Sequence, residues 1–460
     1  MRGRAARLPN AALIPTTSVV TSHAQDRSWL RLARNVGLVF FLVAVFGAVE
    51  HDTLYANAAI TTMSEKEIRD LFIEQMERGN ALRQVALLAL GCVGVAGMAS
   101  SREKPWNVRW SVLAPLVVLV ALSCLSIAWT PQPVVTAKRL VVLACVLTGC
   151  AGLARILTPR EFLGVSLATL LLFISGSIAV DMAAGGRPWS GDYRFGGTLH
   201  PNAQATYCAI LAIAANCLRL GFGRRWLKLV IIAAALGLIV LTESRTGLMA
   251  AVAALVLTWM VKLPPGMRWA GFSLGIAGAT LLVVAYFSVG SGARSRVVDT
   301  ALLGRSQQAG SLTGRLPLWD ELLDHAADKP LLGYGYEGFW TEKRIAAIMR
   351  SQGWSLQNAH NSYFEILLQL GYVGLFLAIW FLIAGSTTLA AATTLTRDPG
   401  YAFAFGVVMF GVLNSGLESL FVKLRYSPVI AMIGLLMVAL YYPLTSSDEP
   451  ESRLPQRRVF

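Results

Sequence analysis

The stretch NAHNSYFEILLQLGYVGLFLAIW, residues 358–380, joins a polar start to an apolar run that continues to about residue 385 without a charge after Glu365. A helix that crosses a bilayer needs about 20 consecutive, mostly apolar residues, and this run supplies them. The whole chain has 460 residues, of which 55% are hydrophobic and only 14% are charged. A soluble globular chain would carry roughly a quarter charged residues. The sequence therefore predicts an all-α polytopic membrane protein.

Apolar runs of similar length recur along the chain, near 35–49, 84–99, 110–128, 139–157, 162–180, 204–218, 226–242, 246–262, 269–290, 361–385, 401–417 and 426–443. We read them as about twelve transmembrane helices within one transmembrane domain, residues 35–443. The longest connection, 291–360, lies between helices 9 and 10. Long loops between helices are usually functional, so we expect function there.

The charges of the short loops predict the orientation. One set of loops and both chain ends are rich in arginine and lysine, and the positive-inside rule makes that side cytoplasmic. We therefore expect a basic, unstructured tail at 1–34 and a second cytoplasmic tail at 444–460. The tail at 1–34 has no small-residue cleavage site of the kind that ends a secretory signal. An even number of spans returns both termini to the cytoplasm and places 291–360 outside.

Composition also argues against several classes of function. The net charge of +14 comes from arginines in membrane-flanking loops, which orientation and lipid contact explain better than nucleic acid does. The six cysteines lie inside apolar runs without a CxxC pair, as expected for small buried thiols. The chain shows no D-x-D pair of carboxylates and no P-loop lysine, so we predict neither a metal nor another cofactor.

Polar residues collect instead at the predicted external ends of the helices. In GDYRFGGTLHPNAQA, residues 191–205, His200-Pro201-Asn202 opens a helix with proline at its first position. The free amides of a helix N-terminus, with Arg194 nearby, would receive an anion. An ordinary loop-to-helix cap is the alternative.

Two further clusters lie on the same side. In LTESRTGL, residues 241–248, Glu243, Ser244 and Arg245 form the turn between two apolar helices, and the alternative is an interfacial arginine paired with Glu243. In residues 311–340, Trp319 and later apolar residues recur at helical spacing. They predict an amphipathic helix that has Arg315 in its first turn and ends at Lys329-Pro330. Aromatic side chains there suit sugar faces or the lipid interface equally.

The fourth cluster is the polar start of the opening stretch. His360 and Asn361 stand at the external mouth of the tenth helix, and Glu365 follows a little over one turn later. A solvated interfacial histidine is the alternative to a catalytic one.

These motifs occur together and in order: RFGGTLHPNAQA, TESRTGL, GRLPLWDELL…KPLLGYGYEGF and AHNSYFEILLQLGYVGL. Together they resemble the O-antigen ligase and Wzy-type polysaccharide polymerase superfamily of bacterial envelope enzymes. SIAWTPQPVVTAKRL, residues 126–140, is similar to the exopolysaccharide-production branch of that superfamily. The resemblance covers roughly 110–440, with the ligase-related part at about 190–385.

The resemblance implies a GT-C-like glycosyltransferase in the bacterial inner membrane. Such an enzyme moves a glycan from an undecaprenyl-diphosphate-linked oligosaccharide to a hydroxyl of a glycan or lipid acceptor, with inversion and without metal, on the periplasmic face. Carried over by motif, the family's arginines correspond to Arg245 and Arg315, and its histidine corresponds to His360. The resemblance also implies flippase and chain-length proteins as envelope partners.

Residue chemistry supports these roles. Two arginines with forked, permanently charged donors suit a diphosphate, and a histidine that titrates near neutral pH suits a general base. We expect Asn361 to orient the His360 ring. We place the remaining candidates around the substrate: Arg194, His200, Asn202, Glu243, Trp319 and Asn361.

Polymerase and ligase share this chemistry and differ in the acceptor; the 126–140 stretch favours an exopolysaccharide polymerase. A transporter or flippase of lipid-linked glycans is the rival from another class, because twelve spans fit it too. Transporters usually hold ionisable residues near the midplane of the membrane, whereas this chain gathers them at one surface. A purely structural scaffold would explain neither the arginines nor the histidine.

Overall fold

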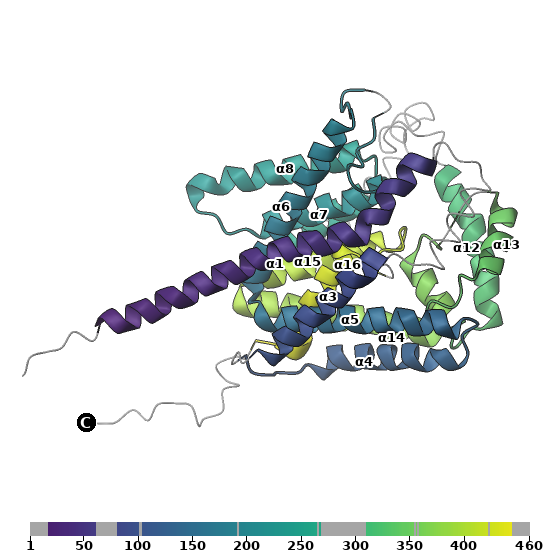
Figure 1. Ribbon diagram of the computed structural model, residues 1–460, viewed down its shortest axis with the longest axis horizontal. Coiled ribbons are helices and arrows are strands. Elements are labelled where there is room, and N and C mark those ends of the chain that lie inside the picture. Colours follow the sequence, from purple (N-terminus) through teal and green to yellow (C-terminus); the bar gives the residue numbers. More distant parts are fainter. Residues whose placement is uncertain are drawn as a thin grey trace, which may run out of the picture.

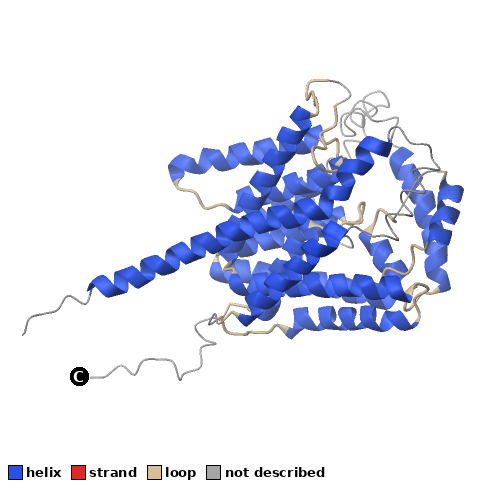
Figure 2. Cartoon of the chain, viewed as in Figure 1, coloured by secondary structure: helices blue, strands red, loops and turns tan. Residues whose placement is uncertain are grey.

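The computed structural model describes residues 17–60, 81–100, 104–190, 193–264, 266–267, 310–353, 356, 358–421 and 424–443. Side chains are described from residue 28 to 50 in the first range and from residue 315 onward in the range 310–353. In this part of the chain the fold is helical throughout, without a named strand (Figure 2).

The longer helices are α1 (Thr17–Ile60), α3 (Ala81–Ala99), α4 (Trp110–Leu125), α5 (Pro133–Ile156), α6 (Pro159–Ala183), α7 (Pro201–Cys217), α8 (Arg225–Leu241), α9 (Arg245–Met260), α12 (Gly310–Asp328), α13 (Glu342–Gln352), α14 (Ser362–Thr396), α15 (Pro399–Asn414) and α16 (Tyr426–Leu440). Short 3₁₀ helices occupy Ser126–Ala128 and Phe222–Arg224. Figure 1 shows α12 and α13 set to one side of the main bundle.

Helix lengths support the prediction of a polytopic membrane protein. Within the described residues, six helices are long and apolar enough to cross a membrane, and α9, α15 and α16 are shorter apolar helices. Eleven of the twelve predicted runs overlap a helix, and the twelfth, 269–290, lies outside the described residues. The number of spans and the side on which each loop lies stay predictions.

The N-terminal tail differs from its prediction. Because α1 begins at Thr17, residues 17–34 are helical, where the sequence analysis expected an unstructured segment. No glycine or proline interrupts 17–36, so a helix nucleated in the apolar run can propagate backwards. Arg34 secures this helix against α6, because its Nη2 lies 2.7 Å from Glu161 Oε1 and its Nη1 donates to the Ile156 carbonyl over 3.1 Å.

Three helices form the centre of the bundle. Almost every side chain of α7, α15 and α16 is buried, and α6, α9 and α14 pack around them (Figure 1). Helices that are apolar on every side are the ones expected inside a helical membrane domain. The central helices therefore hold both ends of the bundle in fixed relative positions.

Helix α14 is broken at Gly371, where φ is 66° and ψ is −167°. The backbone groups that the break releases bond to the segment after α12. Tyr372 N donates to Pro330 O over 2.8 Å, and Leu368 O accepts from Tyr334 N over 2.9 Å. Two further bonds join Val373 N to Leu331 O and Gly335 N to Gln369 O. A helix can be interrupted at membrane depth only where protein re-satisfies its backbone in this way.

The predicted amphipathic helix is α12, and it ends at Asp328 as expected, directly before Lys329-Pro330. It begins at Gly310, so Arg315 lies in its second turn and the prediction of a first-turn position is wrong. The buried face is set by Leu318, Leu322 and Ala326, whereas Leu323 is exposed. These side chains share a small core with Phe339, Ile348 and Leu368, separate from the core of the main bundle. That core packs α12 and α13 on the first segment of α14.

Candidate active site

The loop before α7 brings the first predicted residues together. His200 is the N-cap of α7, with Pro201 at the first position, and its Nδ1 accepts from Asn202 N over 3.3 Å. Arg194 donates from Nε to Thr242 O over 2.9 Å and from Nη2 to Asn202 Oδ1 over 3.0 Å. The predicted helix start is confirmed, and Asn202 is held toward the interior while His200 stays exposed at the cap.

The turn between α8 and α9 lies beside this loop. Glu243 has a left-handed backbone, with φ of 56°, and its Oε2 lies 4.0 Å from Arg194 Nε. Ser244 caps α9 by accepting from Gly247 N, so Arg245 is the first helical residue and is half-buried. Arg194 thus places a cation beside Glu243, and the pairing of Arg245 with Glu243 stays an alternative.

Glu418 is the residue that joins the clusters. It lies in the loop between α15 and α16, and its side chain is 19% exposed. Its Oε1 accepts from Asn202 Nδ2 over 2.9 Å and from Arg315 Nη2 over 3.3 Å, and its Oε2 lies 3.9 Å from His360 Nδ1. One carboxylate therefore links α7, α12 and the start of α14. We call Arg194, Asn202, Glu243, Arg315, His360 and Glu418 the carboxylate network.

Arg315 reaches this network from α12. It also donates from Nη1 to the Leu417 carbonyl, so its guanidinium is fixed by the 417–418 backbone and by the Glu418 carboxylate together. An arginine has five N–H donors, and these contacts use two of them. The remaining donors are available to a ligand.

His360 is held in a strained backbone conformation, with φ of 50°. Its N–H donates to Asn358 Oδ1 over 3.0 Å, and the same oxygen accepts from Ser419 Oγ over 2.9 Å. Left-handed backbone is uncommon for residues other than glycine and tends to persist at functional sites. His360 and Glu243, two members of the carboxylate network, both show it.

Asn361 has a capping role that the sequence analysis did not predict. Its Oδ1 accepts from Tyr363 N over 2.9 Å and from Phe364 N over 3.2 Å, as the N-cap of α14, and its Nδ2 donates to Gly416 O over 2.9 Å. Its amide therefore fixes the helix start to the 415–419 loop, while Glu418 takes the place beside the His360 ring. That Asn361 orients the imidazole stays a prediction.

Two other predicted residues support the site from behind. Trp319 donates from Nε1 to Ala359 O over 2.9 Å and stacks on Phe364 with ring centroids 5.5 Å apart. Glu365 is buried and accepts from Trp340 Nε1 over 2.8 Å and from Ala359 N over 2.6 Å. Both fix the backbone that leads to His360.

A phenol near the carboxylate network stays protonated. Burial, together with the hydrogen bond and the negative charge of Asp181, raises the pKa of Tyr193 well above its ordinary value. Tyr193 precedes Arg194 directly, so it contributes no negative charge there at neutral pH. In the described part of the chain, no group of three or more His, Cys, Asp or Glu side chains is placed to hold a metal ion.

Sequence reasoning missed Glu418. It stands in NSGLESL, residues 414–420, at the end of the eleventh predicted span. The signal was available: a carboxylate in a short loop that the charge map places on the same side as His360. It went unnoticed because the loop has no motif of its own.

The described helices are those of a helical protein with several helices long and apolar enough to cross a membrane. Residues 229–379 match the family model described as O-Antigen ligase. This segment contains Arg245, Arg315 and His360. It begins later than the expected boundary near residue 190, so Arg194 and Asn202 lie before it.

The more particular match is to an exopolysaccharide protein. Over 303 residues the chain is 25% identical to "Exopolysaccharide production protein ExoQ" of Rhizobium meliloti (strain 1021). The aligned region covers 62% of this chain and 67% of that protein. The two matches confirm the resemblance to the O-antigen ligase and Wzy-type polymerase superfamily and to its exopolysaccharide branch.

Proposed function

We propose that the protein is an inner-membrane glycosyltransferase that polymerises repeat units of an exopolysaccharide or O-antigen on the periplasmic face. The family match supports a ligase-type or polymerase-type transfer, and the ExoQ match favours the polymerase. The donor in this proposal is an oligosaccharide on undecaprenyl diphosphate, and the acceptor is a sugar hydroxyl.

The observation that carries the proposal is the position of Glu418. Arg315 and His360, which lie 45 residues apart in the chain, both lie within 4 Å of its carboxylate oxygens. Glycosyl transfer from a diphosphate needs a cation at the leaving group and a base at the attacking hydroxyl. The carboxylate network provides both kinds of group close together.

In the proposed reaction, Arg315 and Arg245 bind the diphosphate through charge-assisted hydrogen bonds. His360 Nε2 takes the proton of the acceptor hydroxyl while that oxygen forms a bond to the anomeric carbon. The bond from this carbon to the phosphate oxygen breaks, and the diphosphate leaves with the electron pair. Attack from the face opposite to the leaving group inverts the anomeric centre.

Glu418 serves in this proposal as the positioning residue of the base. Its Oε2 lies 3.9 Å from His360 Nδ1, close enough for its negative charge to stabilise the imidazolium that proton transfer forms. The sequence analysis gave the positioning role to Asn361.

An apolar groove beside the carboxylate network suits the carrier lipid. It has a volume of about 240 Å³, and it lies between α14 and α15 with Tyr363 at one wall, three residues after His360. Leu382, Ile383 and Met409 line it further along. We propose that part of the prenyl chain lies here while its diphosphate reaches Arg315.

A glycan profile of a deletion strain tests the polymerase. Single capped repeat units would support it, whereas long polymer left on its carrier would instead indicate a ligase that delivers finished glycan to lipid A-core. A matched strain carrying the wild-type chain on a plasmid should restore the normal profile.

Reconstitution separates the enzyme from a flippase. Proteoliposomes that contain the purified protein and a lipid-linked oligosaccharide should form a new glycosidic bond. Movement of the oligosaccharide across the bilayer without any new bond would refute the glycosyltransferase.

A further inference from the structure

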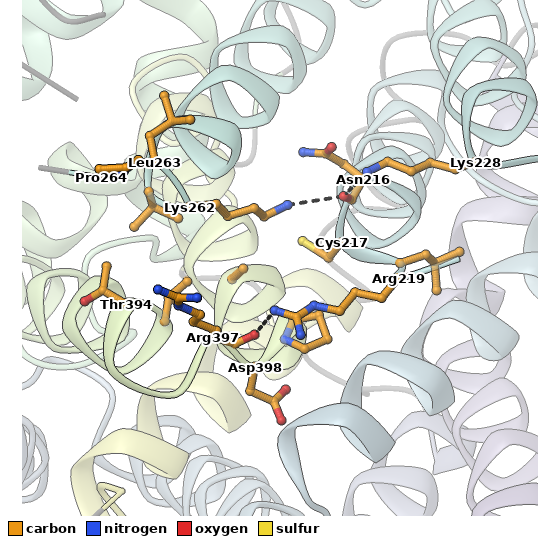
Figure 3. Close-up of a pocket in the computed structure, with 15 residues that line it drawn as sticks. Asn216, Cys217, Arg219, Lys228, Lys262, Leu263, Pro264, Thr394, Arg397 and Asp398 are labelled. Atoms are coloured by element: carbon orange, nitrogen blue, oxygen red, sulfur yellow. Dashed lines mark hydrogen bonds between the residues drawn. The ribbon is translucent and has the colours of Figure 1, made fainter. Parts of the chain in front are cut away.

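A second polar site lies at the opposite ends of the helices that carry the carboxylate network. It is a cavity of about 700 Å³ between the end of α7, the start of α8, the ends of α9 and α14 and the start of α15 (Figure 3). Sites for small molecules and cofactors commonly have volumes of roughly 300–1,000 Å³. The cavity is therefore large enough for a ligand.

Four of the residues that line the cavity are cations: Arg219, Lys228, Lys262 and Arg397. Lys228 and Lys262 come from different helix ends and both donate to the carbonyl of Asn216, Lys262 over 3.2 Å. Arg219 donates to the carbonyl of Arg397 (Figure 3). Backbone carbonyls at helix ends thus hold three of the four cations along the cavity wall.

The described residues supply no carboxylate that pairs with these cations. Asp398 lines the cavity too, but its Oδ1 accepts from Gly400 N over 2.9 Å at the start of α15. Its Oδ2 lies 3.2 Å from Arg160 Nε, which balances the negative charge. The cavity is left strongly positive.

Part of the remaining lining is apolar. Val261, Leu263, Pro264 and Ala402 stand beside the cations, at the ends of apolar helices. A ligand that fits both parts has an anionic group joined to an apolar body, at the level where helices leave the membrane. Basic pockets between helices at this level suit phospholipid headgroups.

We propose that this cavity binds the phosphate of an acidic phospholipid headgroup, at a site separate from the proposed active site. The cations contact the phosphate, and the apolar wall contacts the glycerol and the first acyl carbons. The inference does not depend on the proposed function, because it uses none of the residues of the carboxylate network.

Native mass spectrometry of the full-length protein tests the proposal, with phosphatidylglycerol and phosphatidylethanolamine as probes. The test variant is Lys228→Ala/Lys262→Ala. The matched control, Arg224→Ala/Arg225→Ala, removes two cations at the start of α8 that do not line the cavity. Both variants should keep the wild-type melting temperature within a few degrees. If Lys228→Ala/Lys262→Ala does not fold, Lys228→Arg/Lys262→Arg replaces it, and this variant should still bind phosphatidylglycerol because it keeps both charges.

We expect wild type and control to prefer phosphatidylglycerol, and the cavity variant to lose affinity roughly 30-fold, since each basic residue near an anionic surface contributes about fivefold. Inorganic pyrophosphate is the soluble probe. The cavity variant could lose pyrophosphate binding while it retains phosphatidylglycerol as well as wild type does. That result would assign the cavity to a soluble anion and overturn the proposal of a lipid site. Equal retention of both probes by cavity variant and control would overturn the site altogether.

Discussion

The two ends of the bundle use charge in different ways. At one end the carboxylate network combines both signs of charge in half-buried side chains, with two left-handed residues and contacts from α7, α12 and α14. At the other end the cavity gathers cations, most of them exposed, and none of them pairs with a carboxylate of the described residues. The same helices α7, α8, α9 and α15 join the two ends.

This difference fits two tasks. Chemistry at a single bond needs groups fixed within a fraction of an ångström, which the network achieves by pairing each charge with another fixed group. Attraction of a headgroup needs mainly a positive field, which exposed cations provide. Substitutions should therefore act sharply at the first end and gradually at the second.

The largest effect is expected from Gly371→Val, which removes the support of the carboxylate network. A Cβ at this position would lie 2.2 Å from Leu331 O, and only glycine readily adopts its backbone angles. We expect loss of folded protein, measured as the amount in the membrane and the melting temperature. Gly237→Ala, where a Cβ meets nothing within 4 Å, should leave both unchanged. A stable Gly371→Val protein would show that the break is not needed.

Next comes His360→Ala. If His360 is the base, polymer formation should fall by roughly 10²–10⁴-fold, while the protein level and melting temperature stay at wild-type values. Purified protein and a lipid-linked oligosaccharide give the rate. Normal polymer at a normal protein level would remove His360 from the mechanism.

Arg315→Lys tests the forked contact. Lysine keeps the charge but lacks the planar fork with which the guanidinium contacts Glu418 and the Leu417 carbonyl, so we expect kcat to fall about 100-fold. Arg350→Lys, at the end of α13 and outside the carboxylate network, is the matched control. Wild-type kcat in Arg315→Lys would mean that a point charge suffices.

Glu418→Gln should have a smaller effect. Glutamine keeps the shape but removes the charge opposite His360, and a pair at 3.9 Å near the surface contributes of the order of 1–2 kcal/mol. We expect about a tenfold loss of kcat with little change in KM. If the negative charge opposite His360 causes this loss, Glu418→Asp should have a higher kcat than Glu418→Gln. A change in KM alone would instead place Glu418 in binding of the substrate.

The smallest effect on catalysis is expected at the opposite end. Lys228→Ala/Lys262→Ala should leave the rate of polymer formation within about twofold, because these residues are separated from the carboxylate network by the length of α8 and α9. The comparison of the two ends would fail if this variant lost as much activity as Glu418→Gln.

The sequence by itself determined the helical membrane class, eleven of the helices and the order of the motifs. Run length and composition carry that information, because each apolar run must satisfy its backbone within one helix. The motifs also identified Arg194, Asn202, Arg315 and His360 as candidates before any contact was known.

Only the tertiary structure decided which of these residues meet. Glu418 acquires its role from neighbours that lie 58, 103 and 216 residues away in the chain, and no local pattern records such distances. Asn361 has a side-chain amide that could bond to the imidazole, but this amide caps α14 and donates to the Gly416 carbonyl. The break at Gly371 likewise depends on the 330–335 segment that packs there. Periodicity determines where helices form, whereas contacts between them decide the chemistry.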